Sequence, residues 1–408
     1  MSKLQELIKE LCPDGVEFMR MDEVFEMRNG YTPSKANDRY WNNGTIPWFR
    51  MEDIRQNGRI LSDSIQHITK EAVKGGRLFP ANSFIIATTA TIGEHALVIA
   101  DSLANQRFTN LTIRKSLVEQ ILVKYLFYYL FIVGEWCKNN TNISGFASVD
   151  MSKFRKLEIP LPPLEVQNEI VRILDTFTSH AAELQAELQA RKEQYEYYRN
   201  KLLTFDENDE GVKWMTLGEI GTFVRGNGLQ KKDFTEIGVG CIHYGQIYTY
   251  YGTSTDTTKS FVSYDLAQKL TKVKSGNLVI ACTSENIEDV CKAVVWLGEE
   301  DIVTGGHACV FAHNEIPKYI AYFFQTEYFF QQKKKYARGA KVIDIKMSDL
   351  SKISIPIPPL SEQQRIVSIL DKFESLVNDL TAGLPAEIAA VQEQYEYYRN
   401  KLLTFKRI

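Results

Sequence analysis

Apolar residues recur at alternating spacings of four and three along residues 170–205. The positions are Ile170, Leu174, Phe177, Ala181, Leu184, Leu188, Arg191, Tyr195, Tyr198, Leu202 and Phe205, with Arg191 as the polar interruption. This spacing places them on one face of an α-helix, and about five such heptads are typical of a coiled coil. With a rise of about 1.5 Å per residue, this helix would span roughly 55–60 Å.

A second stretch near the end of the chain has a similar but less regular pattern. Its apolar positions include Leu380, Leu384, Ile388 and Val391. Two consecutive spacings of four form a stutter, which locally unwinds a coiled coil. Gly383 and Pro385 lie at the same place. We therefore expect a kink or a break in this second helix.

The two stretches belong to an internal repeat. The sequence QYEYYRNKLLTF occupies residues 194–205 and again residues 394–405. Upstream, IPLPPL at 159–164 matches IPIPPL at 355–360, and EVQNEIVRILDTF at 165–177 matches SEQQRIVSILDKF at 361–373. A chain with a repeat of this length consists of two half-molecules. Two long helices of one period in one chain favour pairing with each other.

The sequence between the helical segments predicts mixed α/β structure. Short apolar runs at residues 83–87 and 277–281 predict buried strands, and residues 125–137 and 318–334 predict helices whose Tyr and Phe residues belong to the core. The resulting division has five parts: 1–13, an N-terminal helix; 14–155, a first variable domain; 156–210, a first helical segment; 211–352, a second variable domain; and 353–408, a second helical segment.

Composition narrows the class of protein. Of the 408 residues, 44% are hydrophobic and 24% are charged, which excludes a mostly disordered chain. The segment Met1–Leu11 predicts a polar amphipathic helix rather than a signal peptide. The six cysteines form no CxxC pair, which indicates neither a zinc site nor a disulfide framework. We expect the protein in the reducing cytoplasm.

The net charge of −3 looks unsuitable for a nucleic-acid binder, but the acidic excess is local. Residues 156–210 carry 6 basic and 12 acidic side chains, whereas residues 14–155 and 211–352 each carry 17 basic and 15 acidic ones. Basic residues concentrate at 28–77 and in the run Lys333-Lys334-Lys335. Two mildly basic lobes joined by an acidic rod would suit contact with DNA at two separate places.

Motifs of common enzymes are missing from the sequence. It contains no GxxxxGK[ST] phosphate loop, no GxGxxG after a strand and no HExxH. The six histidines lack the spacing of metal ligands, and His307 in Gly305-Gly306-His307 is the one in a suggestive loop. The residues alone leave three hypotheses: a DNA-recognition scaffold, a protein-interaction scaffold, and a DNA-modifying enzyme with an unrecognised site.

The order of the motifs resembles that of the specificity subunits of type I restriction-modification systems. A variable domain is followed by IPLPPL-x-x-Q-x-x-I-V-x-I-L-D-x-F, and a second variable domain by IPIPPL-x-E-Q-Q-x-I-V-x-I-L-D-x-F. The opening of the first variable domain, Gly30-Tyr31-Thr32-Pro33-Ser34, is also similar to that family. One departure is Val166, which stands where the second copy keeps Glu362 in a Glu-Gln pair.

The resemblance implies an α+β fold in which two α/β target-recognition domains are separated by two long antiparallel coiled-coil helices. It also implies a division of labour. Each variable domain would read one half of a bipartite DNA target in the major groove, and the helices would fix the gap and dock two modification subunits. Catalysis would belong to partners: S-adenosylmethionine to the modification subunits, and ATP and Mg²⁺ to restriction subunits. This chain would itself be non-catalytic and free of cofactors.

Two groups of residues are candidates for contacts. Arg, Lys, Asn, Gln, Ser, Thr and aromatic residues in glycine-containing loops are the natural suppliers of groove contacts. Those selected are Arg28, Asn29, Tyr31, Lys35, Arg50, Thr88, Thr89, Asn105 and Gln106 in the first domain, and Asn227, Lys231, Tyr244, Gln246, Tyr248, Thr283, Ser284, His307, Arg338 and Lys341 in the second. For the coil and partner interface they are Tyr195, Tyr197, Tyr198, Arg199, Leu202 and Phe205 with Tyr395, Tyr397, Tyr398, Arg399, Leu402 and Phe405.

Two further expectations concern the ends and the middle of the coil. The apolar stripe Leu4, Leu7, Ile8 and Leu11 should pack near Leu402 and Phe405 at the end of the second helix. The tandem AELQ at 182–185 and 186–189 resembles the spacer repeats with which family members set the gap between half-sites.

Overall fold

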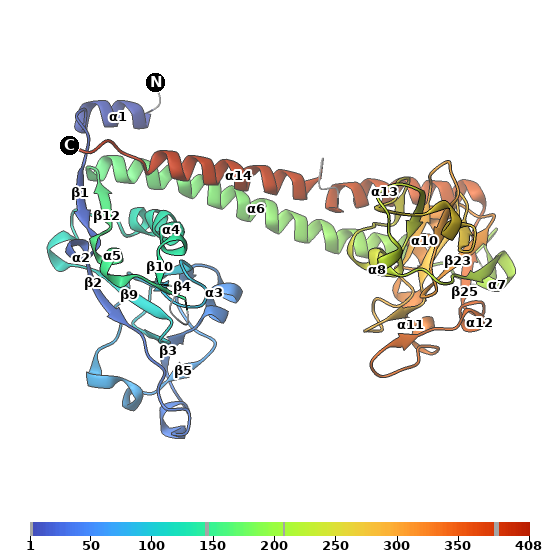
Figure 1. The fold of residues 1–408 in the computed structure, drawn as a ribbon, viewed down its shortest axis with the longest axis horizontal. Coiled ribbons are helices and arrows are strands. Elements are labelled where there is room, and N and C mark those ends of the chain that lie inside the picture. Colours follow the sequence, from blue (N-terminus) through green and yellow to red (C-terminus); the bar gives the residue numbers. More distant parts are fainter. Residues whose placement is uncertain (1–2, 143–146, 207–208, 379–382) are drawn as a thin grey trace. The chain divides into compact units, whose positions relative to one another are not determined.

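The computed structural model describes residues 3–142, 147–206, 209–378 and 383–408 (Figure 1). By contact the chain divides into two compact units: residues 1–183 with 388–408, and residues 184–387. Each unit contains one α/β part and one portion of each long helical segment. Each long helical segment is thus shared between the two units, and the five-part division by sequence remains a prediction.

The first unit is built on a five-stranded sheet. In spatial order its strands are β2 (Phe25–Asn29), β9 (Phe108–Ile113), β6 (Ser83–Ala87), β7 (His95–Val98) and β4 (Ile60–Leu61). Only the β4–β7 pair is parallel among these described strands. A smaller sheet has the order β5 (His67–Ile68), β3 (Ile46–Phe49), β8 (Leu103–Ala104).

Strand β6 explains why its sequence is a continuous apolar run. Phe84 and Ile86 face a core shared with the helices, while Ile85 and Ala87 face a second core with the residues of β3. A strand buried on both faces cannot alternate between polar and apolar residues. The predicted strand at 83–87 is confirmed.

The second unit repeats this architecture. Its large sheet has the order β14 (Gly221–Arg225), β23 (Ala308–His313), β19 (Leu278–Ala281), β21 (Ala293–Trp296), β16 (Ser254–Thr255), again with one parallel pair, β16–β21. Its small sheet is β17 (Ser260–Val262), β15 (Val239–Ile242), β22 (Ile302–Thr304), β18 (Thr271–Val273). The predicted strand at 277–281 is confirmed as β19, one residue shorter.

The aromatic helices lie as predicted in the first unit and differ in the second. Helix α4 (Val123–Asn139) covers the predicted segment, and Tyr125 in it is fully buried. Residues 318–334 form two helices, α10 (Pro317–Phe323) and α11 (Glu327–Lys334), rather than one. The break occurs because Thr326 Oγ1 accepts a hydrogen bond from Phe329 N and so starts a new helix.

The shorter elements connect these parts. Those of the first unit are β1 (Glu17–Arg20), α2 (Met21–Val24), η1 (Asp38–Tyr40), α3 (Met51–Asn57), η2 (Lys70–Ala72), η3 (Lys74–Gly76), η4 (Lys115–Leu117), β10 (Thr141–Asn142), β11 (Ser148–Val149), α5 (Met151–Lys156) and β12 (Glu158–Leu161). Those of the second are β13 (Lys213–Thr216), α7 (Leu217–Ile220), η5 (Lys231–Asp233), α8 (Tyr244–Thr249), α9 (Tyr264–Ala267), β20 (Thr283–Ser284), β24 (Ile343–Asp344), α12 (Met347–Leu350) and β25 (Ser354–Ile357).

The first helical segment is one helix, α6 (Leu164–Leu202), and the second is two, α13 (Leu360–Asn378) and α14 (Leu384–Leu402). A bend at Gly383 precedes α14, in agreement with the predicted kink or break, and Leu380 lies outside the described residues.

The helices pair antiparallel within each unit. In the first unit Phe177 stacks on Tyr398 with ring centroids 5.5 Å apart, while Glu158, before α6, pairs with Arg407, after α14. In the second unit Tyr198 stacks on Phe373, also at 5.5 Å. The predicted pairing of the two helical segments is thus confirmed at both ends. The heptad spacing does not include Leu203 and Leu403, which are also buried.

Each helical segment is fastened to its α/β part by the same hydrogen bonds. Gln167 Oε1 accepts from Leu122 N at 2.8 Å, and Gln363 Oε1 accepts from Ile316 N at 3.1 Å. These are the glutamines of the repeated PPL-x-x-Q motif.

A second set of duplicated bonds lies about two turns further along each coil helix. Tyr128 OH donates to Asp175 at 2.6 Å, and Tyr322 OH donates to Asp371 at 2.6 Å. Lys124 and Lys318 pair with the same two carboxylates. The duplicated polar residues therefore fix the angle between coil and α/β part in each unit.

Both ends of the chain lie in the first unit (Figure 1). Helix α1 (Lys3–Leu11) buries Leu4 in the core that contains Leu403, with Leu402 and Phe405 packed against it. Val16 N donates to Lys406 O at 2.9 Å, and Ile408 N donates to Val16 O at 3.2 Å. Gly15 is required there because a Cβ would lie 2.6 Å from Lys406 O. The expected packing of the N-terminal helix beside the coil end is confirmed.

Replacing Leu4 by alanine should lower the free energy of unfolding by about 2 kcal/mol, because a buried leucine leaves a cavity. Leu4 is 5% exposed, whereas Leu11 on the same helix is 40% exposed. Leu11→Ala is therefore the matched control, with an expected loss of roughly 0.5 kcal/mol or less. Urea unfolding followed by circular dichroism measures both. Equal losses for the two variants would contradict the packing of α1.

All six cysteines are buried and unpaired. Burial raises the pKa of the thiols of Cys137 and Cys241 to about 12. Among the described helices, none combines the length and the apolar character needed to cross a bilayer.

Candidate nucleic-acid interface

A group of loops in the first unit carries six basic side chains, of which five are exposed and Arg28 is half-buried. The basic loop surface consists of Arg28, Lys35, Arg39, Lys70, Lys74 and Arg77. Thr69 ties its two segments together, because Thr69 Oγ1 donates to Arg39 O at 2.8 Å and Thr69 N donates to Tyr40 O at 3.0 Å.

Aromatic rings hold two of these cations in place. Arg28 Nη2 donates to Arg77 O at 3.0 Å, and its guanidinium lies 4.8 Å from the centroid of the Phe79 ring. Lys74 Nζ lies 4.8 Å from the centroid of Tyr31, whose OH donates to Ala72 O. Burial, followed by the charge of Arg77, lowers the pKa of Arg28. Fixed cations of this kind are suited to phosphate contacts.

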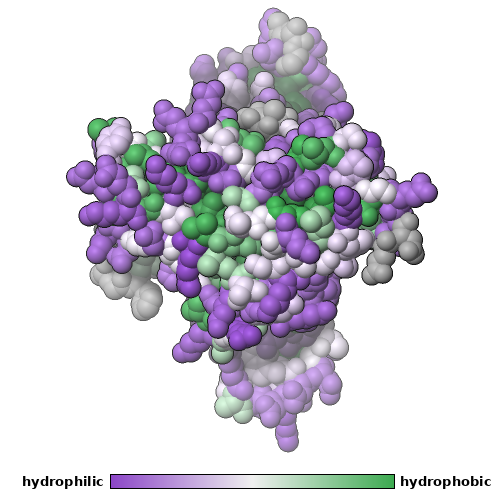
Figure 2. Space-filling model, turned by 90° about the vertical axis from the view of Figure 1, so that its right-hand side faces the viewer, coloured by the Kyte–Doolittle hydropathy of each residue, from purple (hydrophilic) through white to green (hydrophobic). Residues whose placement is uncertain are grey.

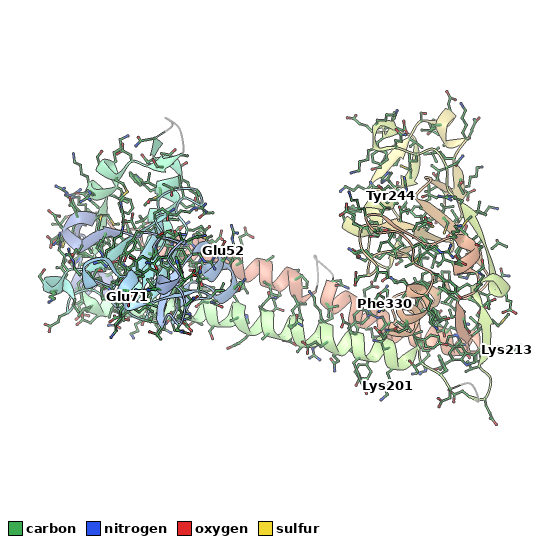
Figure 3. All side chains as sticks on the ribbon, turned by 90° about the horizontal axis from the view of Figure 1, so that it is seen from below. Glu52, Glu71, Lys201, Lys213, Tyr244 and Phe330 are labelled. Carbon is green, nitrogen blue, oxygen red and sulfur yellow. The ribbon has the colours of Figure 1, made fainter. Side chains whose placement is uncertain are left out.

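The second unit presents a pocket of rings instead. This ring pocket, a cavity of about 360 Å³, is lined by Gly228, Leu229, Gln230, Lys231, His243, Tyr244, Gly306 and His307. The Tyr244 ring lies 4.5 Å from the His243 ring and 4.8 Å from the His307 ring. In Figure 3 the labelled Tyr244 lies farther from the coil than Phe330 and Lys201 do.

The backbone under the ring pocket is set by a helix cap. His243 precedes α8, and its N donates to Gln246 Oε1 at 3.0 Å. The first unit has a cap of the same kind: Arg50 precedes α3, and its N donates to Asp53 Oδ2 at 2.6 Å. Burial, together with the charges of Lys231 and His307, lowers the pKa of His243, so this ring is neutral near pH 7.

Three of the nine residues selected in the first unit serve the fold. Thr88 is buried and its N donates to Arg107 O at 2.9 Å, so its selection as a groove contact is corrected. Asn105 Oδ1 accepts from Arg107 N at 3.0 Å and shapes a turn. Asn29 Oδ1 accepts from Thr109 Oγ1 at 3.1 Å, although Asn29 itself is exposed.

The other six remain predictions. Lys35 and Gln106 are exposed, and Arg28, Tyr31, Arg50 and Thr89 are half-buried. Gln106 bonds to Thr32, and Arg50 lies over the Trp48 ring.

In the second unit three selected residues make hydrogen bonds that hold the loops in place. Thr283 is buried and its Oγ1 lies 3.1 Å from His307 Nδ1. Tyr248 OH donates to Thr283 O at 2.6 Å. Gln246 is occupied by the cap described above and by Ser260 Oγ. The selection of Thr283 as a groove contact is corrected because this residue is buried, whereas Tyr248 and Gln246 are half-buried and remain predictions.

The remaining residues of the second unit lie near these supports. Lys231, Tyr244 and His307 line the ring pocket, and Asn227 is exposed beside it, with Nδ2 donating to Lys269 O at 2.8 Å. Ser284 in β20 pairs with Ile343 of β24, and Arg338 N donates to Asp344 O at 3.1 Å. The β20–β24 pairing thus brings Ser284 beside the segment from Arg338 to Asp344, which contains Lys341.

One lysine of the basic run at 333–335 does not face solvent. Lys333 is buried, with Nζ donating to Glu288 O at 2.8 Å and to Val290 O at 2.7 Å. Burial lowers the pKa of this ammonium. Lys333 therefore supports the loop after Ser284, and its ammonium group is not available for a contact with DNA.

The two identical coil segments expose the same tyrosine–lysine pair. Tyr197 and Tyr397 are each 59% exposed. Lys201 Nζ lies 5.6 Å from the Tyr197 centroid, and Lys401 Nζ lies 5.4 Å from the Tyr397 centroid. We call each Tyr–Lys pair, 197/201 and 397/401, a coil surface.

One face of the molecule, shown in Figure 2, is mainly hydrophilic with smaller hydrophobic areas.

Most of the other interface candidates face inward. Arg399 is buried over the Phe131 ring at 4.6 Å, and Arg199 Nη1 donates to Gln325 Oε1 at 3.3 Å. They line equivalent cavities of about 830 and 510 Å³ between coil and α/β part. The expected partner contact through Arg399 is corrected because this residue is buried, whereas Arg199 is half-buried and remains a prediction. Tyr195, Leu202 and Phe205 with Tyr395, Leu402 and Phe405 are buried or half-buried along the coil.

Sequence reasoning missed Arg107, which is exposed at the start of β9. Alignment of the two repeats places Arg107 opposite His307, and this correspondence identifies Arg107 as a candidate. Among the described residues no group of three His, Cys, Asp or Glu side chains could hold a metal ion.

Comparison with known proteins decides the family. The family model for the type I restriction modification DNA specificity domain matches twice, at residues 13–193 and 209–390. The chain belongs to this family. It is 39% identical to the Escherichia coli type I restriction enzyme EcoprrI specificity subunit, over 93% of each chain. It is 34% identical to the E. coli EcoR124I/EcoR124II specificity subunit, over 70% of this chain and 72% of that one.

Solved structures support the fold of this specificity subunit. A structure concerned with complex assembly and conformational transition of the type I R-M system matches with a TM-score of 0.66 at 18% identity, covering 96% of this chain and 98% of that one. The HsdS subunit from Thermoanaerobacter tengcongensis matches with a TM-score of 0.51 at 18% identity, covering 97% and 99%. The α+β class with two target-recognition domains and long helices is confirmed.

Proposed function

We propose that each unit of this specificity subunit reads one half of a bipartite target in double-stranded DNA, while the two coil surfaces each dock one modification subunit. One observation carries the proposal. The two units share a fold but present different loops, whereas the pairs Tyr197/Lys201 and Tyr397/Lys401 are identical in sequence and similar in geometry. Different loops suit different half-sites, and identical surfaces suit identical partners.

The chemistry of the loops supports DNA as the target. Lysine and arginine contacts to phosphates set the register of a protein on DNA, and contacts to base edges carry sequence. The basic loop surface supplies the first kind, and exposed polar residues beside it supply the second.

Chemical activity would belong to the partners. Modification subunits would bring S-adenosylmethionine, and restriction subunits, where present, would bring ATP and Mg²⁺. The role of this chain is to bind and orient, and the cytoplasm is the proposed location.

The deciding experiment is methylome sequencing of the host with and without this gene, with DNA binding of the purified complex measured at several salt concentrations. We expect methylation at a bipartite motif that disappears with the gene, and affinity that falls steeply with salt. Salt-insensitive binding to protein alone would favour an interaction scaffold. Binding of S-adenosylmethionine by the isolated chain would favour a stand-alone enzyme.

Stoichiometry tests the coil surfaces. Native mass spectrometry of the wild-type complex should show two modification subunits per chain. Tyr197→Asp or Tyr397→Asp should each leave one, and the double variant none, because the exposed aromatic ring over the lysine is lost and a charged side chain takes its place. Tyr264→Asp, at a 71% exposed tyrosine outside the repeat, is the control. A wild-type ratio of one to one would contradict the proposal.

The gap between half-sites tests the spacer. The two AELQ units lie inside the continuous helix α6. Four more helical residues add about 6 Å. Insertion of a third AELQ after Gln189 should lengthen the non-specific gap and leave both half-sites intact in methylation mapping. An unchanged gap would exclude this role for the repeat.

A further inference from the structure

The two units present one exposed side chain from the same backbone position. Arg107 immediately precedes β9, and His307 immediately precedes β23. The carbonyl of Arg107 accepts from Thr88 N at 2.9 Å, and that of His307 accepts from Cys282 N at 2.9 Å. Thr88 and Cys282 each follow the central strand of their sheet, β6 and β19. The sheet therefore fixes both positions equally.

A glycine brings a second loop against each position. Gly30 N donates to Phe108 O at 2.9 Å, and Gly226 N donates to Ala308 O at 2.9 Å. A Cβ on Gly30 would lie 2.2 Å from Asn105 O, and one on Gly226 would lie 2.0 Å from Gly305 O. Such distances exclude any side chain at these glycines. Two loops thus meet beside Arg107 and beside His307 in the same way.

The side chains at the two positions are available for a ligand. Arg107 is exposed and takes part in none of the ion pairs found within the described ranges. His307 is exposed, its Nδ1 is engaged by Thr283 Oγ1, and its ring lies against Tyr244. The remaining polar atom of the imidazole is Nε2. Both side chains are therefore anchored at their base and have hydrogen-bonding atoms to spare.

We propose that Arg107 and His307 are the equivalent base-reading positions of the two units. The inference rests on the proposed DNA-recognition function and assigns one specificity-determining residue to each half-site. A guanidinium forms two hydrogen bonds with guanine O6 and N7 in the major groove, and an imidazole Nε2 forms one hydrogen bond with a base edge. The lysines of the basic loop surface contact phosphate instead and carry no preference for sequence.

The test uses the complex of the full chain with its modification subunits and a DNA library in which each half-site position is varied. Arg107→Ala should lower the preference for guanine at one position of one half-site by about tenfold or more and leave the other half-site unchanged. His307→Ala should relax one position of the other half-site alone. His307→Arg should create a guanine preference at that position. Lys74→Ala is the control, because loss of a phosphate contact weakens all sequences alike.

The outcomes separate the two levels of the proposal. If the wild-type complex methylates no bipartite motif, the proposed function fails. If it does, and Arg107→Ala or His307→Ala changes no position or weakens all sequences equally, the assignment of the reading positions fails. Thermal melting checks that each variant is folded, and Arg107→Lys, which keeps the charge but loses the second hydrogen bond, should still reduce the guanine preference.

Discussion

Replacing Gln167 by methionine should lower the free energy of unfolding of the first unit by about 3 kcal/mol. The side chain is fully buried, accepts from Leu122 N, and donates to Pro162 O at 2.7 Å and to Gln120 O at 3.0 Å. Methionine fills a similar volume but leaves these buried backbone groups without partners, and each such group costs about 1–3 kcal/mol. Urea unfolding measures the loss.

The repeat supplies the matching variants. Gln363 makes the equivalent bonds to Ile316 N and Pro358 O, so Gln363→Met should destabilise the second unit by a similar amount. Its neighbour Gln364 is exposed, and Gln364→Met should change stability by roughly 0.5 kcal/mol or less. If Gln363→Met and Gln364→Met had equal effects, the buried amide would not be what fastens the coil.

Acid should destabilise the first unit through one histidine. His95 is fully buried against the rings of Phe127 and Phe131, with Nε2 lying 3.2 Å from Phe127 O. Burial, reinforced by the charge of Arg59, lowers the pKa of His95 from 6.5 to about 3. Above pH 6.5 the ring is neutral in both the folded and the unfolded chain, so the full stability is present.

Below pH 6.5 only the unfolded chain takes up the proton, so stability falls by about 1.4 kcal/mol per pH unit until the folded pKa is reached. Between pH 6.5 and 4.5 the expected loss is about 2–3 kcal/mol. His95→Met should remove this component, and His180→Gln, at an exposed histidine of α6, should not. The difference between wild type and variant isolates His95 from the carboxylates. Identical pH profiles for wild type and His95→Met would refute this assignment.

Periodicity and repetition predict the scaffold well because both are local signals. The spacing of Ile170, Leu174 and Tyr195 is set by the helix, and the run at 83–87 by burial on both faces of a strand. The break at Thr326 was missed because a capping threonine inside an apolar helical pattern has no effect on periodicity.

The loops were predicted less well because their role depends on contacts distant in sequence. Thr283 and Tyr248 are polar residues beside glycine or turn residues, yet they support His307 from within. Lys333 belongs to a basic run, but its Nζ meets two carbonyls some 43 and 45 residues upstream. Charge and residue type identify candidates, and only the fold separates those that face solvent from those that hold a loop.

Burial of every cysteine has a practical consequence for experiments on the duplicated coil surfaces. Maleimide dyes react with accessible thiolates, and a buried structural cysteine is inert. A single cysteine introduced at Tyr197 or at Tyr397 would therefore be the one labelled site of the chain. Fluorescence from such a dye would report occupancy of one copy while its sequence-identical twin stays silent.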